Sequence, residues 1–114
     1  MVVAEPYLPL FVYGTLRDNE SLESLVGPIV DRRPAAVANG RWQSVAPFPA
    51  VSFQVADEQI PGELVWLSPS GFQSAIAELD DYERVPDLYR RIRIVARSNE
   101  GEVEAYAYEW RHNE

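Results

Sequence analysis

One long helical pattern, set among segments that alternate like strands, constrains the fold of this chain more than any other feature. The stretch GFQSAIAELDDYERV, residues 71–85, repeats apolar side chains at the spacing of an α-helix. Ser68 or Ser70 is placed to cap its start, and Pro86 forces the helix to stop near Val85. We therefore expect one long amphipathic helix in the second half of the chain.

Two alternating segments follow this helix. In YRRIRIVAR, residues 89–97, apolar side chains and arginines fall on opposite faces. In EVEAYAYEW, residues 102–110, alanines and a valine alternate with tyrosines and acids. The turn SNEG between them predicts a β-hairpin, with arginines across from glutamates as stabilising pairs.

The first half of the chain adds further strands and one short helix. Residues 8–13, LPLFVY, are apolar throughout, which is typical of a strand buried on both faces. We also expect a helix over 20–26 that Asp18 or Asn19 caps and Gly27 ends, a weak strand or bend over 34–45, and strands at 48–55 and 60–68. This order predicts one α+β domain over residues 1–114: a small mixed, mainly antiparallel, barrel-like sheet with flanking helices.

The composition excludes several kinds of chemistry. All ten basic residues are arginine and no cysteine is present, which rules out a Schiff-base lysine, a phosphate-loop lysine and a thiol nucleophile. A single histidine, His112, is too few for a histidine metal site or a catalytic triad. We therefore expect neither metal nor cofactor, and any catalysis must use carboxylates, tyrosines, other hydroxyls, arginines and backbone amides.

Charge and hydropathy bear on partners and location. The net charge of −8 disfavours nucleic acid and anionic membranes as main partners. No segment approaches the roughly 18 apolar residues of a membrane span, and MVVAEPYLPLF lacks the basic region of a signal peptide. The absence of cysteine fits a reducing compartment. We expect a cytoplasmic protein, and the sequence leaves its oligomeric state open.

One acid of the long helix falls on its apolar face. At about 100° per residue, Glu83 projects about 20° from Phe72, in the same stripe as Ile76 and Leu79. An ionised carboxylate in the core is costly unless it is paired or its pKa rises. A carboxyl group with a pKa near neutrality is what a general acid–base catalyst needs.

A purely structural interpretation of Glu83 is equally open at this point. The helix can end at Tyr82, so that Glu83 turns away and pairs with Arg90 or Arg91 on the following strand. Acids clustered on a helix are usually a solvated face. Periodicity alone does not decide between a paired carboxylate and a catalytic one.

The stretch VYGTLRD, residues 12–18, ends the first strand in an unusual way. Gly14 permits a positive φ and lets a ligand approach the backbone closely. The amides of Thr15, Leu16 and Arg17 are placed to converge on an anion or a polarised carbonyl oxygen. The alternative is a plain loop between a strand and a helix.

Four stretches occur in the order seen in a known family: VYGTLR near the N-terminus, FPAV at 48–51, IPGELVWL at 60–67 and LDDYERVPDLYRR at 79–91. From Leu10 to about Trp110 the chain thereby resembles the γ-glutamylcyclotransferase-like family, which includes γ-glutamylamine cyclotransferase and the AIG2-like proteins. The resemblance implies that the turn formed by Tyr13, Gly14, Thr15 and Leu16 binds substrate. It also implies that Glu83 matches the family's catalytic glutamate.

The activity implied by this resemblance is a cofactor-independent intramolecular aminolysis. The α-amine of a γ-glutamyl amine, amino acid or peptide attacks its own γ-carbonyl, which releases 5-oxoproline and a free amine. Glu83 would move the protons as general acid–base, and the backbone of the 13–17 loop, including Arg17, would hold the carboxylate or oxyanion. Tyr108 is the preferred pocket-lining tyrosine, ahead of Tyr89 and Tyr106.

One departure from the family and one alternative function accompany this interpretation. Many members of the family have glycine after the glutamate, where this chain has Arg84, a bulky cation beside the candidate catalytic group. The alternative function is a non-catalytic module that keeps the fold and binds a small molecule or a partner. The leaving amine is not specified by any readable motif.

Overall fold

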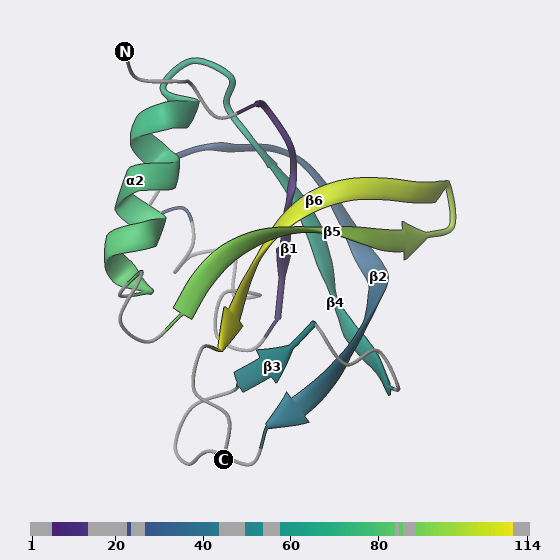
Figure 1. Cartoon of the computed structure of the whole chain (residues 1–114). Coiled ribbons are helices and arrows are strands. Elements are labelled where there is room, and N and C mark those ends of the chain that lie inside the picture. Colours follow the sequence, from purple (N-terminus) through teal and green to yellow (C-terminus); the bar gives the residue numbers. More distant parts are fainter. Residues whose placement is uncertain are drawn as a thin grey trace.

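Six strands and the helix α2 are described along their whole length. The computed structural model describes residues 6–13, 23, 27–43, 50–53, 58–83, 85 and 89–110. The elements are β1 (Leu10–Val12), β2 (Ile29–Gln43), β3 (Ala50–Ser52), β4 (Glu58–Leu67), α2 (Phe72–Tyr82), β5 (Tyr89–Ser98) and β6 (Gly101–Trp110) (Figure 1). The predicted helix over 20–26 lies outside the described residues except for Glu23, which is helical.

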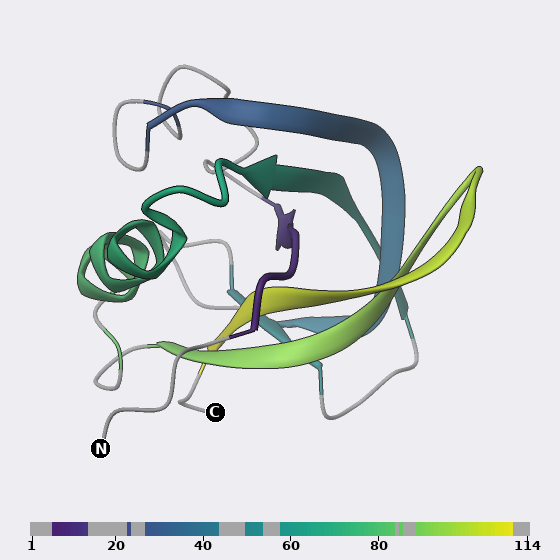
Figure 2. The same cartoon turned by 90° about the horizontal axis from the view of Figure 1, so that it is seen from above.

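The strands form one mixed sheet that closes into a barrel. Their order is β3-β2-β4-β1-β6-β5, and β2 also pairs with β5. This additional pairing, at Val37–Arg97 and Ala38–Ala96, closes a ring of five strands with β3 attached to β2. Figure 2 shows α2 outside the ring, against one side. Among the pairings of the described strands, only β1–β6 is parallel, so the predicted mixed, mainly antiparallel, barrel-like sheet of an α+β fold is confirmed.

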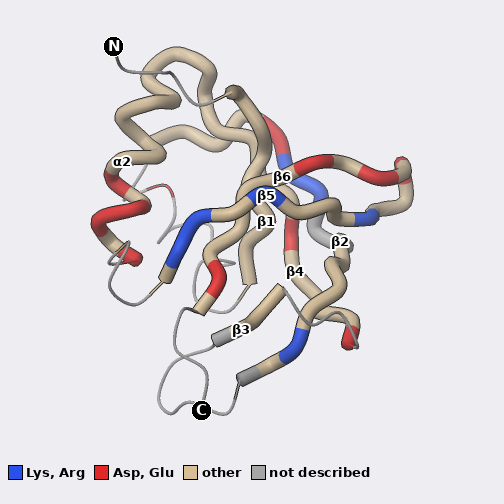
Figure 3. The backbone as a smooth tube through the Cα atoms, viewed as in Figure 1, with Lys and Arg blue, Asp and Glu red and all other residues tan. Residues whose placement is uncertain are grey.

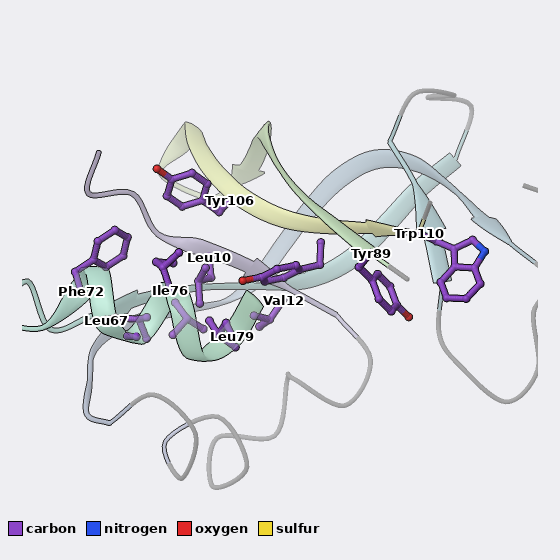
Figure 4. Close-up of a cluster of buried hydrophobic side chains, with 12 residues drawn as sticks. Leu10, Val12, Leu67, Phe72, Ile76, Leu79, Tyr89, Tyr106 and Trp110 are labelled. Atoms are coloured by element: carbon purple, nitrogen blue, oxygen red, sulfur yellow. The ribbon is translucent and has the colours of Figure 1, made fainter. Parts of the chain in front are cut away.

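Alternate side chains of the strands fill two separate cores, because neighbouring residues of a strand point to opposite faces. The barrel interior holds Phe11, Tyr13, Ala36, Ala38, Val51, Ile60, Leu64, Ala96, Ala105 and Ala107. The second core holds Leu10, Val12, Val65, Leu67, Tyr106, Tyr108 and Trp110, together with the apolar face of α2 (Figure 4). β1 is therefore buried on both faces, as its unbroken apolar sequence predicts.

The hairpin of β5 and β6 is confirmed, but its charge pairing is only partly as predicted. Arginines lie across from glutamates at Arg97–Glu102 and Arg90–Glu109. Between these two pairs, Arg91 and Arg93 lie across from Tyr108 and Tyr106. Glu104, Tyr106 and Tyr108 share one face of β6. Glu109 falls on the other face, with Ala105 and Ala107, and is buried there.

The start of α2 differs from the predicted serine cap. Gly71 is the N-cap residue, with φ of +82°, and no side chain caps the helix. A residue with a side chain adopts this left-handed conformation rarely, which explains why glycine stands there. The predicted caps Ser68 and Ser70 are therefore wrong.

β2 is much longer than the weak strand or bend predicted over 34–45. It extends over fifteen residues and contacts β3, β4 and β5. Its pairing with β4 shifts register between Ile29 and Asp31 and between Arg33 and Ala36. The second shift contains Pro34, which cannot donate to the ladder and is tolerated at such irregularities. Within the described part of the chain, no helix is long and apolar enough to cross a membrane.

A glycine-to-alanine change in β4 tests the packing of the barrel. At Gly62 an added Cβ would lie 2.5 Å from the Val12 carbonyl oxygen and 2.7 Å from the Phe11 ring. Because the backbone of β1 cannot yield easily, Gly62→Ala is expected to lower the free energy of unfolding by about 1–3 kcal/mol. Urea denaturation measures this, with the exposed Gln59→Ala as control. A Gly62→Ala protein as stable as wild type would contradict the packing.

Candidate functional site

Glu83 lies at the C-terminal end of α2, half-buried. Tyr82 is the last helical residue, and Glu83 follows as the C-cap with φ of −82°. Its N–H still donates to the carbonyl of Leu79 at 2.9 Å, as in the preceding helical turn. The helix thus ends at Tyr82, as the structural interpretation expects, yet Glu83 is still partly buried.

The surroundings of Glu83 favour its neutral form. Burial raises the pKa of its carboxyl group from the ordinary value of 4.5 to about 7. A position after the last helical turn adds nothing favourable for an anion, because the helix dipole is negative at this end. Glu83 can therefore gain or lose a proton near neutral pH, unlike a solvent-exposed glutamate.

The arginines proposed as partners of Glu83 are bound to other acids. Arg90 contacts the Oε1 atom of Glu109 through Nε at 2.7 Å and Nη2 at 2.6 Å. Arg91 Nε lies 3.6 Å from Asp80 Oδ1. Figure 3 shows the acidic end of α2 next to the basic start of β5. Among the described residues, none forms an ion pair or hydrogen bond with the Glu83 carboxylate, so the alternative in which Glu83 pairs with Arg90 or Arg91 is wrong.

Tyr13 connects the end of β1 to two other strands. Its hydroxyl group donates a hydrogen bond to the backbone carbonyl of Tyr108, and its ring contacts the half-exposed Trp42 edge-on at 5.9 Å. Burial raises the pKa of Tyr13, and the charges of Tyr89 and Glu83 raise it further, while a backbone hydrogen bond from Val51 acts in the opposite direction. The predicted site residue Tyr13 therefore lies within electrostatic range of Glu83.

Tyr108 is the second predicted site residue near Glu83. Its hydroxyl group donates to Asp80 Oδ1 at 2.8 Å, which joins β6 to the last turn of α2. Burial raises the pKa of Tyr108, and so do the charge of Asp80, the hydrogen bond to Asp80 and the charge of Glu83. Asp80 projects to the boundary of the helix's apolar face, and its periodicity alone does not mark it as a site residue.

The other two candidate tyrosines differ in their surroundings. Burial and the charge of Glu83 raise the pKa of Tyr89 to about 12, so Tyr89 belongs to the group around Glu83. The Tyr106 ring instead stacks on Phe72 at the start of α2, and its hydroxyl group donates to the Pro6 carbonyl at 2.8 Å. Tyr106 thus packs at the opposite end of the helix (Figure 4).

Four predicted binding residues lie outside the described residues: Gly14, Thr15, Leu16 and Arg17. The same holds for Arg84 and His112. The binding role of the 14–17 backbone therefore stays a prediction. The described residues bring together Glu83 with Tyr13, Tyr89 and Tyr108, and they contain no group of three acids or histidines that could hold a metal ion.

The group formed by Glu83 and the three tyrosines is suited to proton transfer. One carboxyl group with a pKa near 7 can accept a proton and return it at neutral pH. The tyrosines around it stay protonated at neutral pH, because burial raises the pKa of each. The site therefore offers one proton carrier surrounded by neutral hydroxyl groups.

The sequence model of the family described as "Gamma-glutamyl cyclotransferase, AIG2-like" matches residues 10–114. A search of curated proteins found no significant match.

Several solved structures share the fold. YkqA from Bacillus subtilis is 24% identical, with a TM-score of 0.72 over 95% of this chain and 37% of that chain. A protein from Arabidopsis thaliana, solved in solution, is 16% identical, with a TM-score of 0.71 over 98% of this chain and 74% of that chain. A gamma-glutamyl cyclotransferase is 17% identical, with a TM-score of 0.62 over 96% of this chain and 69% of that chain. The chain therefore spans little more than a third of YkqA, and at these identities the similarity shows the fold alone.

The raised pKa of Glu83 predicts a pH-dependent cost in stability. Because the folded-state pKa of about 7 exceeds the ordinary 4.5, the folded state holds this proton more tightly. The resulting stability is present below the unfolded-state pKa and is lost as the pH rises through about 7. Glu83→Gln is expected to avoid this loss and to be more stable than wild type at about pH 8 by on the order of 1–3 kcal/mol.

Urea unfolding of both proteins at about pH 5 and about pH 8 measures the effect. The exposed Glu78→Gln, on the same helix, is the matched control and is expected to follow wild type at both values. A difference between Glu83→Gln and wild type that does not grow with pH would show that the Glu83 carboxyl group is not desolvated.

Proposed function

The chain belongs to the AIG2-like gamma-glutamyl cyclotransferase family, and from this we propose that it is a γ-glutamyl cyclotransferase with Glu83 as its general acid–base. Its substrate would be a γ-glutamyl amine, amino acid or peptide, and its products 5-oxoproline and a free amine. The pKa of Glu83, raised to about 7 by burial without an arginine partner among the described residues, is the observation that carries this proposal.

The reaction depends mainly on holding the substrate in a conformer that is ready to cyclise. The nucleophile and the electrophile belong to one molecule, so the protein gains rate chiefly by holding the conformer in which the α-amine faces the γ-carbonyl. The new C–N bond closes a five-membered lactam, and the old C–N bond to the leaving amine breaks. No water is consumed and no electron is transferred.

Proton movement is the part assigned to Glu83. The attacking nitrogen must lose a proton, and the leaving nitrogen must gain one. A carboxylate placed between the two can accept the first proton and deliver it to the second. A glutamate of ordinary pKa is a weaker base for this task than one whose pKa lies near the working pH.

The tyrosines and the first loop complete the proposed site. Tyr13 and Tyr108 both lie within the electrostatic range of Glu83, and their hydroxyl groups donate to the Tyr108 carbonyl and to Asp80. The backbone amides of residues 14–17 follow Tyr13 directly in the chain and would bind the α-carboxylate or the developing oxyanion.

Removal of the Glu83 carboxylate is expected to abolish turnover without unfolding the protein. Wild type, Glu83→Gln and the control Glu78→Gln would be incubated with a panel of γ-glutamyl compounds, and 5-oxoproline followed by mass spectrometry. We expect Glu83→Gln to lose at least roughly two to four orders of magnitude in turnover, and Glu78→Gln to keep wild-type activity. A folded wild-type protein that forms no 5-oxoproline from any compound would favour the non-catalytic binding module.

The pH dependence of catalysis gives a separate test. Because Glu83 must be ionised to accept a proton, kcat/KM should rise with pH and level off above about 7. Steady-state kinetics from about pH 5 to about pH 9 would measure this acidic limb. A limb with its midpoint near the ordinary glutamate pKa of 4.5 would contradict the assignment.

A further inference from the structure

Asp80 lies on the last turn of α2, close to Glu83 in the sequence. It lies three residues before Glu83, so the two acids project from the same side of the last turn of α2. The N–H of Val85 donates to the Asp80 carbonyl at 2.9 Å, which fixes the chain just beyond Glu83. Asp80 therefore contacts the backbone that leads away from Glu83.

The hydrogen bond between Asp80 and Tyr108 has a defined polarity. An ionised carboxylate has no proton to donate, so the hydroxyl proton must come from Tyr108. The two oxygens are 2.8 Å apart. The proton of Tyr108 is therefore directed toward the helix, and the remaining lone pairs of its oxygen can only accept hydrogen bonds.

Arg91, on β5, lies beside the same Asp80 carboxylate. Its Nε lies 3.6 Å from the same Oδ1 atom of Asp80, and its guanidinium group lies over the Tyr106 ring, 5.2 Å from the centroid. The guanidinium group of Arg91 and the hydroxyl group of Tyr108 thus meet at one oxygen atom of Asp80, on which Tyr108 acts as the donor.

We propose that Asp80 is a positioning residue that makes the Tyr108 oxygen a hydrogen-bond acceptor for the α-amino group of the substrate, beside Glu83. This inference rests on the proposed function for the identity of the ligand. The α-amino group carries several N–H bonds, and an acceptor next to Glu83 would direct one of them while another faces the carboxylate. Tyr108 thus selects ligands that have an α-amino group, and Asp80 acts only through Tyr108.

A pair of ligands that differ only in the amino group tests this directly. The probes are γ-glutamylmethylamide and N-methylglutaramate, which keeps the carboxylate and the amide but lacks the α-amine. Their binding would be measured calorimetrically in the Glu83→Gln protein, where no turnover interferes. We expect the amine to improve affinity roughly tenfold or more.

Asp80→Asn and Tyr108→Phe, each added to Glu83→Gln, are expected to reduce this advantage to within about twofold, while the affinity for N-methylglutaramate stays unchanged. The two changes together should cost no more than either alone, because they break one interaction. Asp81→Asn is the matched control, since Asp81 is the exposed neighbour of Asp80 on the same turn. Circular dichroism would establish that each variant is folded, and Tyr108→Phe carries the test if Asp80→Asn is not.

The outcomes separate this inference from the proposed function. The inference is overturned if the amine gives no advantage, if the advantage survives both substitutions, or if both ligands weaken equally, as a merely structural role would produce. If wild type forms no 5-oxoproline but the amine advantage depends on Asp80 and Tyr108, the proposed activity fails and the inference stands. If wild type forms 5-oxoproline but the amine advantage persists in the Asp80 and Tyr108 variants, the proposed activity stands and the inference fails.

Discussion

The packing of α2 against the outer face of the barrel determines the properties of the candidate site. The apolar face of the helix is buried against β1, β4 and β6, and this contact fixes both the rotation of the helix and the position of its last turn. Glu83 follows that turn directly, so its carboxyl group is carried into surroundings that desolvate it. A helix rotated outward would give an ordinary surface glutamate with an ordinary pKa.

Glu83 differs from the other shielded carboxylates near this contact in its charged neighbours. Three other shielded carboxylates among the described residues each pair with an arginine: Asp80 with Arg91, Glu109 with Arg90 and Glu63 with Arg32. Glu109, only 1% exposed, also accepts the Phe53 N–H at 2.6 Å. These ion pairs join strands to one another and α2 to β5. Glu83 has no comparable partner in the described part of the chain, and a carboxyl group in that situation can exchange its proton near neutral pH.

The sequence predicts local features of this arrangement well. The helical projection placed Glu83 on the apolar face, and the unbroken apolar run of β1 indicated burial on both sides, because both depend only on local periodicity. The left-handed cap at Gly71 and the length of β2 were missed, since each depends on contacts with distant segments. The link between Tyr13 and Tyr108 joins residues 95 positions apart. Periodicity carries no information about such a pair, nor about the partner of Asp80.

The central claim is that the Glu83 carboxyl group titrates near neutrality in the folded protein. NMR of protein carrying carbon-13 in its glutamate side chains, with Glu83→Gln to assign the resonance, would follow this one carboxyl carbon against pH. We predict a midpoint at about 7. A midpoint near 4.5, the ordinary value for a glutamate, would contradict the account, because a carboxylate that is solvated or paired would leave the site without its proton carrier.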